Sequence, residues 1–129
     1  MDMLMPRYAW EFPPHTDKRP ILRGEQNAGI ALRHRDYMVD GRLMIGCTEE
    51  NPWVAIADIT KVRHRLLKDV SKTDWLAAGF VAQDEVFQFF EELYPGKVTW
   101  DSDVTVVHWK DIRGRAVEDL RAADNARPK

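Results

Sequence analysis

The chain lacks several features that would define a specialised class of protein. It has one cysteine, Cys47, in 129 residues, so neither an intramolecular disulfide nor a cysteine-rich zinc site can form. No apolar run approaches the roughly 20 residues of a membrane-spanning helix, and residues 1–6 lack the basic and apolar regions of a signal peptide. These absences predict a cytoplasmic protein with no membrane partner.

Motifs for metals and cofactors are also missing. The four histidines are scattered, and no His-Glu-x-x-His spacing occurs. Residues 24–29 contain neither the lysine of a P-loop nor the three glycines of a dinucleotide-binding fingerprint. The sequence therefore favours a protein without a metal site and without a cofactor.

The composition is that of a globular protein. Apolar residues make up 44% of the chain and charged residues 31%, which suits one compact domain of ordinary size. Cys47 ends the apolar run 43–47, so we expect a small buried side chain there and no reactive thiol.

Charge is unevenly distributed, although the net charge is only −2. Residues 18–42 contain six basic and three acidic side chains, and residues 61–72 contain five basic and one acidic. Residues 74–92 carry five acids and no lysine or arginine. Such segments either bind polyanions locally or form solvated faces without a partner, and the sequence leaves both open.

Alternation of apolar and polar residues predicts an α+β fold. We expect strands over residues 8–12, 28–35, 42–47, 53–67 and 103–111, the last of them central and covered on both faces. Asp40-Gly41 is a strong turn signal and predicts a hairpin between the second and third strands. The alternation shifts near Asp58, as a bulge that closes a small barrel would require.

Boundary residues predict two short helices. Residues 16–24 can form a helix that ends at Gly24. Ser71 and Asp74 resemble a capping box, so a helix should begin after Ser71. Gly79 is placed to end that helix.

A longer helix and a polar tail complete the chain. The helix over residues 84–93 should present one apolar face made of Val86, Phe87, Phe90 and Leu93. Residues 113–129 are polar and rich in alanine, so they form a loose helix or fray. The predicted organisation is one domain over residues 1–112 followed by the tail 113–129.

Five short segments occur in an order that points to a known family. They are residues 59–62, 79–80, 84–87, 94–96 and 104–109. Together with residues 21–24 and 37–43 upstream, they resemble the ASCH family of PUA-like domains over about two thirds of the chain. The resemblance implies a small PUA-like β-barrel with flanking helices, a cleft beside residues 23–35, and relatives that bind RNA or modified nucleobases.

The resemblance also implies hydrolytic relatives, from which this sequence departs. Some members are amidohydrolases of acylated cytidine nucleosides, with catalytic lysine, threonine and glutamate, and ribonuclease activity is attributed to others. The corresponding positions here hold Gln26 or Ala28, then Ala31, then Gly79. None of these side chains is a general base or an amine nucleophile near neutral pH. No catalytic residue is assigned, and a hydrolase with a non-standard catalytic set is the alternative.

The residues that remain suit recognition. Gln26 and Asn27 carry amides that both donate and accept, as reading a base edge requires. Arg33, His34 and Arg35 form a cationic run that can hold phosphate or stack on bases. The leading hypothesis is a module that binds RNA, single-stranded nucleic acid or a modified nucleoside in the cleft.

Other residues extend the predicted binding set. It also includes Arg23, and Trp53 as the first choice for stacking on a base. Arg63 and Arg65 form a second basic stripe, for which a charged strand edge protected from pairing is the alternative. The other four tryptophans are expected in the core. A protein-interaction domain, suggested by the acidic segment 74–92, is a third hypothesis.

Overall fold

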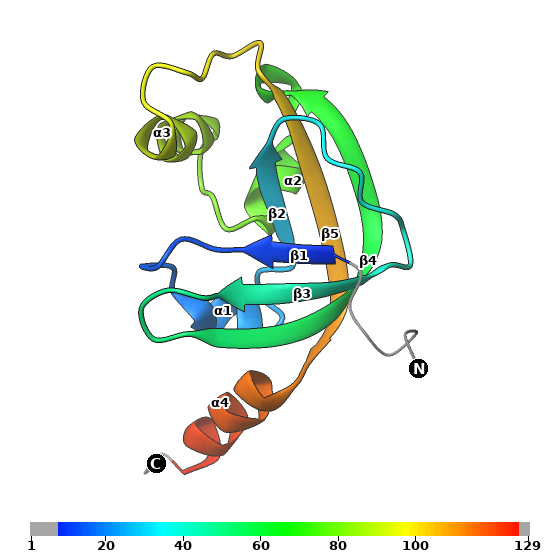
Figure 1. Cartoon of the computed structure of the whole chain (residues 1–129), viewed down its shortest axis with the longest axis vertical. Helices are drawn as coiled ribbons and strands as arrows, with labels where there is room; N and C mark the ends of the chain where they lie inside the picture. Colours follow the sequence, from blue (N-terminus) through cyan, green and yellow to red (C-terminus); the bar gives the residue numbers. More distant parts are fainter. Residues whose placement is uncertain (1–7, 127–129) are drawn as a thin grey trace.

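The computed structural model describes residues 8–126, which form a curled five-stranded sheet with four α-helices (Figure 1). The strands are β1 (Tyr8–Glu11), β2 (Ala28–Leu32), β3 (Arg42–Cys47), β4 (Trp53–Leu66) and β5 (Asp103–Arg113). The helices are α1 (Lys18–Leu22), α2 (Lys72–Ala77), α3 (Gln83–Leu93) and α4 (Arg115–Asn125). The predicted α+β barrel is confirmed. Residues 1–7 of the predicted domain and 127–129 of the predicted tail lie outside the described residues.

The sheet has the strand order β1-β3-β4-β5-β2, with β1 parallel to β3 and the other pairs antiparallel. The predicted hairpin between β2 and β3 is wrong, because β2 pairs with β5 at the far end of the sheet. A turn does form, with Gly41 N–H donating to the Met38 carbonyl over 3.0 Å. However, Asp40 N–H donates to Ile59 of β4, so the turn docks on another strand.

The long strand β4 bends where the alternation of its side chains predicted. Its register with β5 shifts between Ile56 and Asp58 and again between Ile59 and Lys61. These irregularities let one strand serve both halves of the barrel: its first half pairs with β3, and its second half pairs with β5 alone.

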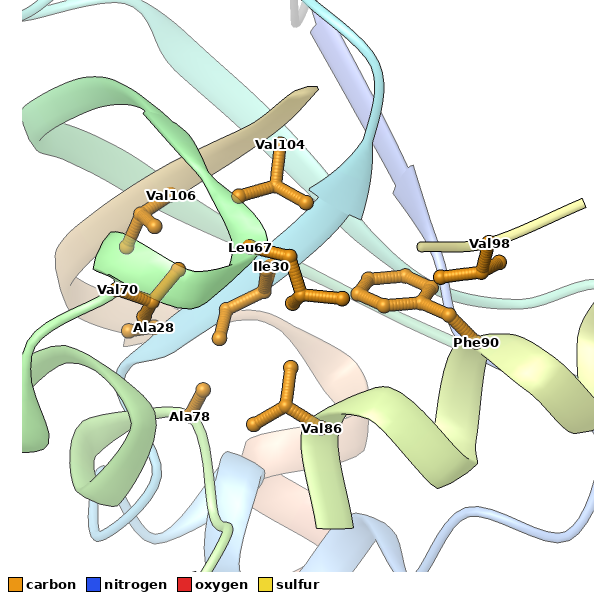
Figure 2. Close-up of a cluster of buried hydrophobic side chains, with 10 residues drawn as sticks. All are labelled: Ala28, Ile30, Leu67, Val70, Ala78, Val86, Phe90, Val98, Val104 and Val106. Atoms are coloured by element: carbon orange, nitrogen blue, oxygen red, sulfur yellow. The ribbon is translucent and has the colours of Figure 1, made fainter. Parts of the chain in front are cut away.

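Two apolar clusters lie on opposite faces of β5. Val104 and Val106 pack with Ile30 of β2 and with Val86 and Phe90 of α3, as Figure 2 shows. Val107 packs on the other face with Trp109 and with the interior residues of β1, β3 and β4. The prediction of a central strand covered on both faces is therefore confirmed.

The predicted helix boundaries are largely confirmed. Ser71 caps α2, its hydroxyl accepting from Asp74 N–H over 3.2 Å, and Gly79 follows the helix with φ +93°, a conformation that favours glycine. On the predicted apolar face of α3, Val86 and Phe90 are buried as expected, whereas Leu93 is 44% exposed. Within residues 8–126, no helix is both long and apolar enough to cross a membrane.

The C-terminal segment, for which the sequence allowed either a loose helix or a frayed end, forms the helix α4. In α4, Val117 is buried against Leu22 and Ala55. An ion pair of 2.9 Å joins Arg23 to Asp124 of this helix. The last helix therefore packs beneath α1 and the start of β4.

Candidate functional site

A cleft of about 640 Å³ opens between the two edge strands and α3. Its walls come from residues 9–14 on and after β1, from residues 29–32 of β2, and from the helical region that includes Phe80, Phe89 and Tyr94. The walls are mainly apolar and aromatic. Their polar members include Gln26 and Arg35 from the segment around β2, and the carboxylates of Glu11 and Glu49. The sequence predicted a cleft beside this segment, and the structure has one.

The aromatic floor of the cleft requires a glycine in β2. A Cβ atom added to Gly29 would lie 2.3 Å from Cζ2 of Trp10, far inside van der Waals contact. Trp10 also lies against Tyr37, with ring centroids 5.8 Å apart. Trp10 is a core residue, as predicted, but it lines the cleft as well.

Gln26, which lines the cleft, lies against Gly79. A Cβ atom on Gly79 would lie 2.7 Å from Oε1 of Gln26. By resemblance, Gly79 corresponds to the glutamate of hydrolytic relatives, and Gln26 is one of two candidates, with Ala28, for their lysine. The fold therefore brings Gln26 and Gly79 together, but the side chains present supply no proton donor or acceptor of suitable pKa.

A second cavity of about 370 Å³ adjoins the cleft and shares Leu32, Arg35 and Tyr94 with it. Its remaining lining residues are Arg33, His34, Lys97, Ser102 and Asp103. Asp103 is the one carboxylate in this lining, against two arginines and a lysine. The mouth of the cleft is therefore cationic on this side.

The turn after β2 is held in an unusual conformation. Arg33 has φ +76°, which costs a non-glycine residue about 1 kcal/mol or more. Its N–H donates to the Asp103 carbonyl, and its own carbonyl accepts from the Thr105 hydroxyl over 2.8 Å. The same hydroxyl accepts from Arg35 N–H over 2.9 Å. The buried Thr105 side chain and the Asp103 carbonyl together hold this turn.

The turn also contacts β4 through two stacked histidines. The rings of His34 and His64 lie 3.7 Å apart at 15°. His34 Nε2 lies 3.2 Å from a carboxylate oxygen of Asp36, and His64 Nδ1 lies 3.3 Å from the Thr105 hydroxyl. The two basic segments of the sequence therefore meet in space.

Arg63 has a different role from Arg33 and Arg35. Its guanidinium donates over 2.6 Å to Asp74, which also lies 2.8 Å from His108 Nε2. Burial alone would raise the pKa of Asp74, but the hydrogen bonds from Arg63 and His108 outweigh it and hold that pKa below its ordinary value. The capping-box interpretation was therefore wrong for the Asp74 side chain, which anchors α2 to the sheet.

The other predicted residues do not line the two cavities. Arg23 is paired with Asp124, and Arg65 donates to the His64 carbonyl. Asn27 joins α2 to the sheet through its backbone, donating to Ala77 and accepting from Trp109. Trp53, predicted to stack on a base, stacks on Phe12 instead, with ring centroids 6.1 Å apart.

Several residues that line the two cavities, or that hold the turn beside them, were not predicted as site residues. They are Trp10, Tyr37, Phe80, Phe89, Tyr94, Lys97 and Thr105. Of these, Tyr37, Phe80, Tyr94 and Thr105 stood in segments that carry the family resemblance, but none was assigned to the site. Within residues 8–126, no group of three or more His, Cys, Asp or Glu side chains could hold a metal ion.

No family model and no curated protein matches the sequence, but solved structures match the fold. A DUF984 protein from Enterococcus faecalis is 19% identical with a TM-score of 0.66, over 89% of this chain and 86% of its own. An ASCH domain from Lactobacillus crispatus is 19% identical with a TM-score of 0.60, over 80% and 77%. An ASCH protein from Zymomonas mobilis is 13% identical with a TM-score of 0.57, over 80% and 66%. The chain therefore has the fold of ASCH domains.

Proposed function

We propose that this protein is a recognition module whose cleft binds an unpaired base of RNA or other single-stranded nucleic acid, or a modified nucleoside. The observation that carries the proposal is the cleft itself, which lies beside β2 and measures about 640 Å³. Ligand sites for small organic groups fall in the range of roughly 300 to 1,000 Å³.

The lining of the cleft suits a base. Tyr94 lines the cleft and is 42% exposed. Exposed aromatic rings stack on unpaired bases of any sequence. Gln26 offers an amide that can both donate to and accept from a base edge. Arg35 can stack on a base or contact a phosphate. The ASCH resemblance, with its RNA-binding relatives, points the same way.

The hydrolytic alternative has less support. By resemblance, Gly79 and either Gln26 or Ala28 stand at two of the positions that catalyse in hydrolytic relatives, and none of these residues is an acid or a base. Incubation with acylated cytidines and with labelled RNA, with and without divalent metal, should give no turnover. If the wild type cleaves one of these compounds and a Gln26→Ala variant does not, the cleft is a catalytic site and the recognition proposal is wrong.

Binding is tested by fluorescence anisotropy of a labelled single-stranded RNA hexamer. Tyr94→Ala should weaken binding about tenfold, since one stacked base is worth roughly 1 to 3 kcal/mol. Arg35→Gln should weaken it and reduce the slope of log K against log salt concentration by about 1.

Arg121→Gln is the matched control, because Arg121 is exposed on α4, away from the cleft. It removes the same charge and should leave the affinity within about twofold. If RNA and free nucleosides both fail to bind the wild type, or if the Tyr94 and Arg35 variants bind like wild type, the proposal is wrong.

A further inference from the structure

The smaller cavity differs from the cleft in its chemistry. Arg33, Arg35 and Lys97 converge on it from two parts of the chain, the turn after β2 and the loop after α3. The cleft beside it is lined mainly by apolar and aromatic side chains. The two cavities share Leu32, Arg35 and Tyr94 in their linings, so they lie side by side.

The cations of the smaller cavity are not used within the fold. Within residues 8–126, neither Arg33 nor Lys97 has a side-chain hydrogen bond or an ion pair, and Arg35 donates only to the Leu32 carbonyl over 3.3 Å. Arg63 and Arg113, by contrast, are both paired with carboxylates. The side chains of Arg33, Arg35 and Lys97 thus carry charges without a carboxylate partner, and they line the cavity that adjoins the cleft.

The backbone that carries two of these cations is fixed in advance. Thr105 is fully buried, and its hydroxyl bonds both the Arg33 carbonyl and the Arg35 N–H. This bonding holds Arg33 in a left-handed conformation that a non-glycine residue rarely adopts. A turn held in this way loses less conformational entropy when its side chains bind a ligand.

We infer that the smaller cavity is a phosphate-binding subsite, so that the ligand is a nucleotide or a nucleic-acid strand and not a free nucleoside. The inference rests on the proposed function of the cleft, and it narrows the ligand class. Arginine binds phosphate through paired N–H donors and lysine as a point charge. The base occupies the aromatic cleft while the attached phosphate lies against Arg33, Arg35 and Lys97.

Calorimetric titration with the four ribonucleosides, and with their 3′- and 5′-monophosphates, tests the inference. The wild type should bind at least one monophosphate about tenfold more tightly than its nucleoside, the gain expected from one charge-assisted contact. The double variant Arg33→Gln/Lys97→Gln should lose this preference while its affinity for the nucleoside is unchanged.

The matched control is Lys110→Gln/Arg121→Gln, which removes the same two charges from exposed positions on β5 and α4. It should keep the preference for monophosphates, since a local subsite does not depend on net charge. If nucleosides and nucleotides bind equally well to the wild type, the subsite is refuted and the proposed function stands. If none of these compounds binds and the RNA hexamer also fails, both are refuted.

Thr105 is tested as a positioning residue. Thr105→Val removes the hydroxyl at almost constant volume and should abolish the preference for monophosphates in a protein that still folds, as circular dichroism would show. Thr105→Ser keeps the hydroxyl and should restore the preference. A Val variant that keeps the full preference would show that the hydroxyl does not position the subsite.

Discussion

The tripeptide Arg-His-Arg occurs twice in this chain, at residues 33–35 and at residues 63–65, and the two copies have different roles. In the turn segment (residues 33–35), the arginine side chains face a cavity and form no ion pair within the described residues. In the strand segment (residues 63–65), Arg63 is bound to the buried Asp74. The histidines of the two copies stack on each other.

The difference comes from what each segment meets in the fold. Asp74 is 1% exposed, and a buried carboxylate must be paired to remain charged. Asp74 therefore forms an ion pair with the guanidinium of Arg63. Among residues 8–126, no buried carboxylate lies beside the turn segment, so its cations stay available to a ligand. Equal sequence and charge thus give a structural site in one place and a candidate binding site in the other.

The largest expected effect comes from removing the buried carboxylate. Asp74→Asn should lower the free energy of unfolding by roughly 3 to 5 kcal/mol, because Arg63 and His108 lose their charged partner. Urea denaturation measures this change. The control, Asp101→Asn, removes a carboxylate that is 74% exposed and paired with Lys68, and it should cost less than about 1 kcal/mol. Equal losses in the two variants would contradict a structural role for Asp74.

The same carboxylate predicts a dependence on pH. Since the pKa of Asp74 is lowered in the folded state, its stabilising contribution is present above the ordinary pKa of about 4 and is lost as the pH falls through the lower, folded value. The wild type should therefore lose more stability below about pH 4 than Asp74→Asn does. Denaturation at a series of pH values measures this difference, and parallel curves would exclude the ion pair as its source.

An intermediate effect separates the two arginine segments directly. Arg63→Gln should cost about 2 kcal/mol, the value of a hydrogen bond to a charged group, because the Asp74 side chain then keeps only its contact with His108. Arg33→Gln should change stability by less than about 0.5 kcal/mol, as exposed substitutions usually do. Thermal or urea unfolding of both variants checks this. Similar losses would mean that the two segments are not distinct in role.

The smallest expected effect concerns the histidine stack. His34 has 60% of its side chain exposed, so His34→Ala should cost only about 0.5 kcal/mol. His64→Ala should cost about the same if the stack is the only shared contact, and somewhat more if the contact with Thr105 adds to it. A double-mutant cycle measures the coupling between the two rings, and zero coupling would show that the stack does not join the segments.

The sequence predicted features that depend on local signals. The bulge near Asp58, the capping of α2 by Ser71 and the turn at Gly79 all follow from neighbouring residues, and the structure has each of them. The ordered short segments also indicated the barrel. Local chemistry is enough for such features, since caps and bulges involve residues a few positions apart.

Features that depend on distant residues were not predicted. The turn at Asp40 was assigned to a hairpin because its sequence is typical of one, yet β2 lies next to β5 instead. The partners of Asp74 are 11 and 34 positions away, and Thr105 is 70 positions from Arg35. Periodicity does not identify such partners. The packing of the Trp53 ring on Phe12 was not predicted either.

The position of the cleft at the two edge strands has a thermodynamic consequence. Its walls include residues of β1 and of β2, which lie at opposite ends of the strand order. A ligand held between them favours the closed sheet, and at a hundredfold excess over its Kd it would add about 2.7 kcal/mol to the stability. The amides of these two short strands should then exchange their hydrogens more slowly than in the free protein. A ligand in the cleft would thus link β1 and β2, the two edge strands, which do not pair with each other in the sheet.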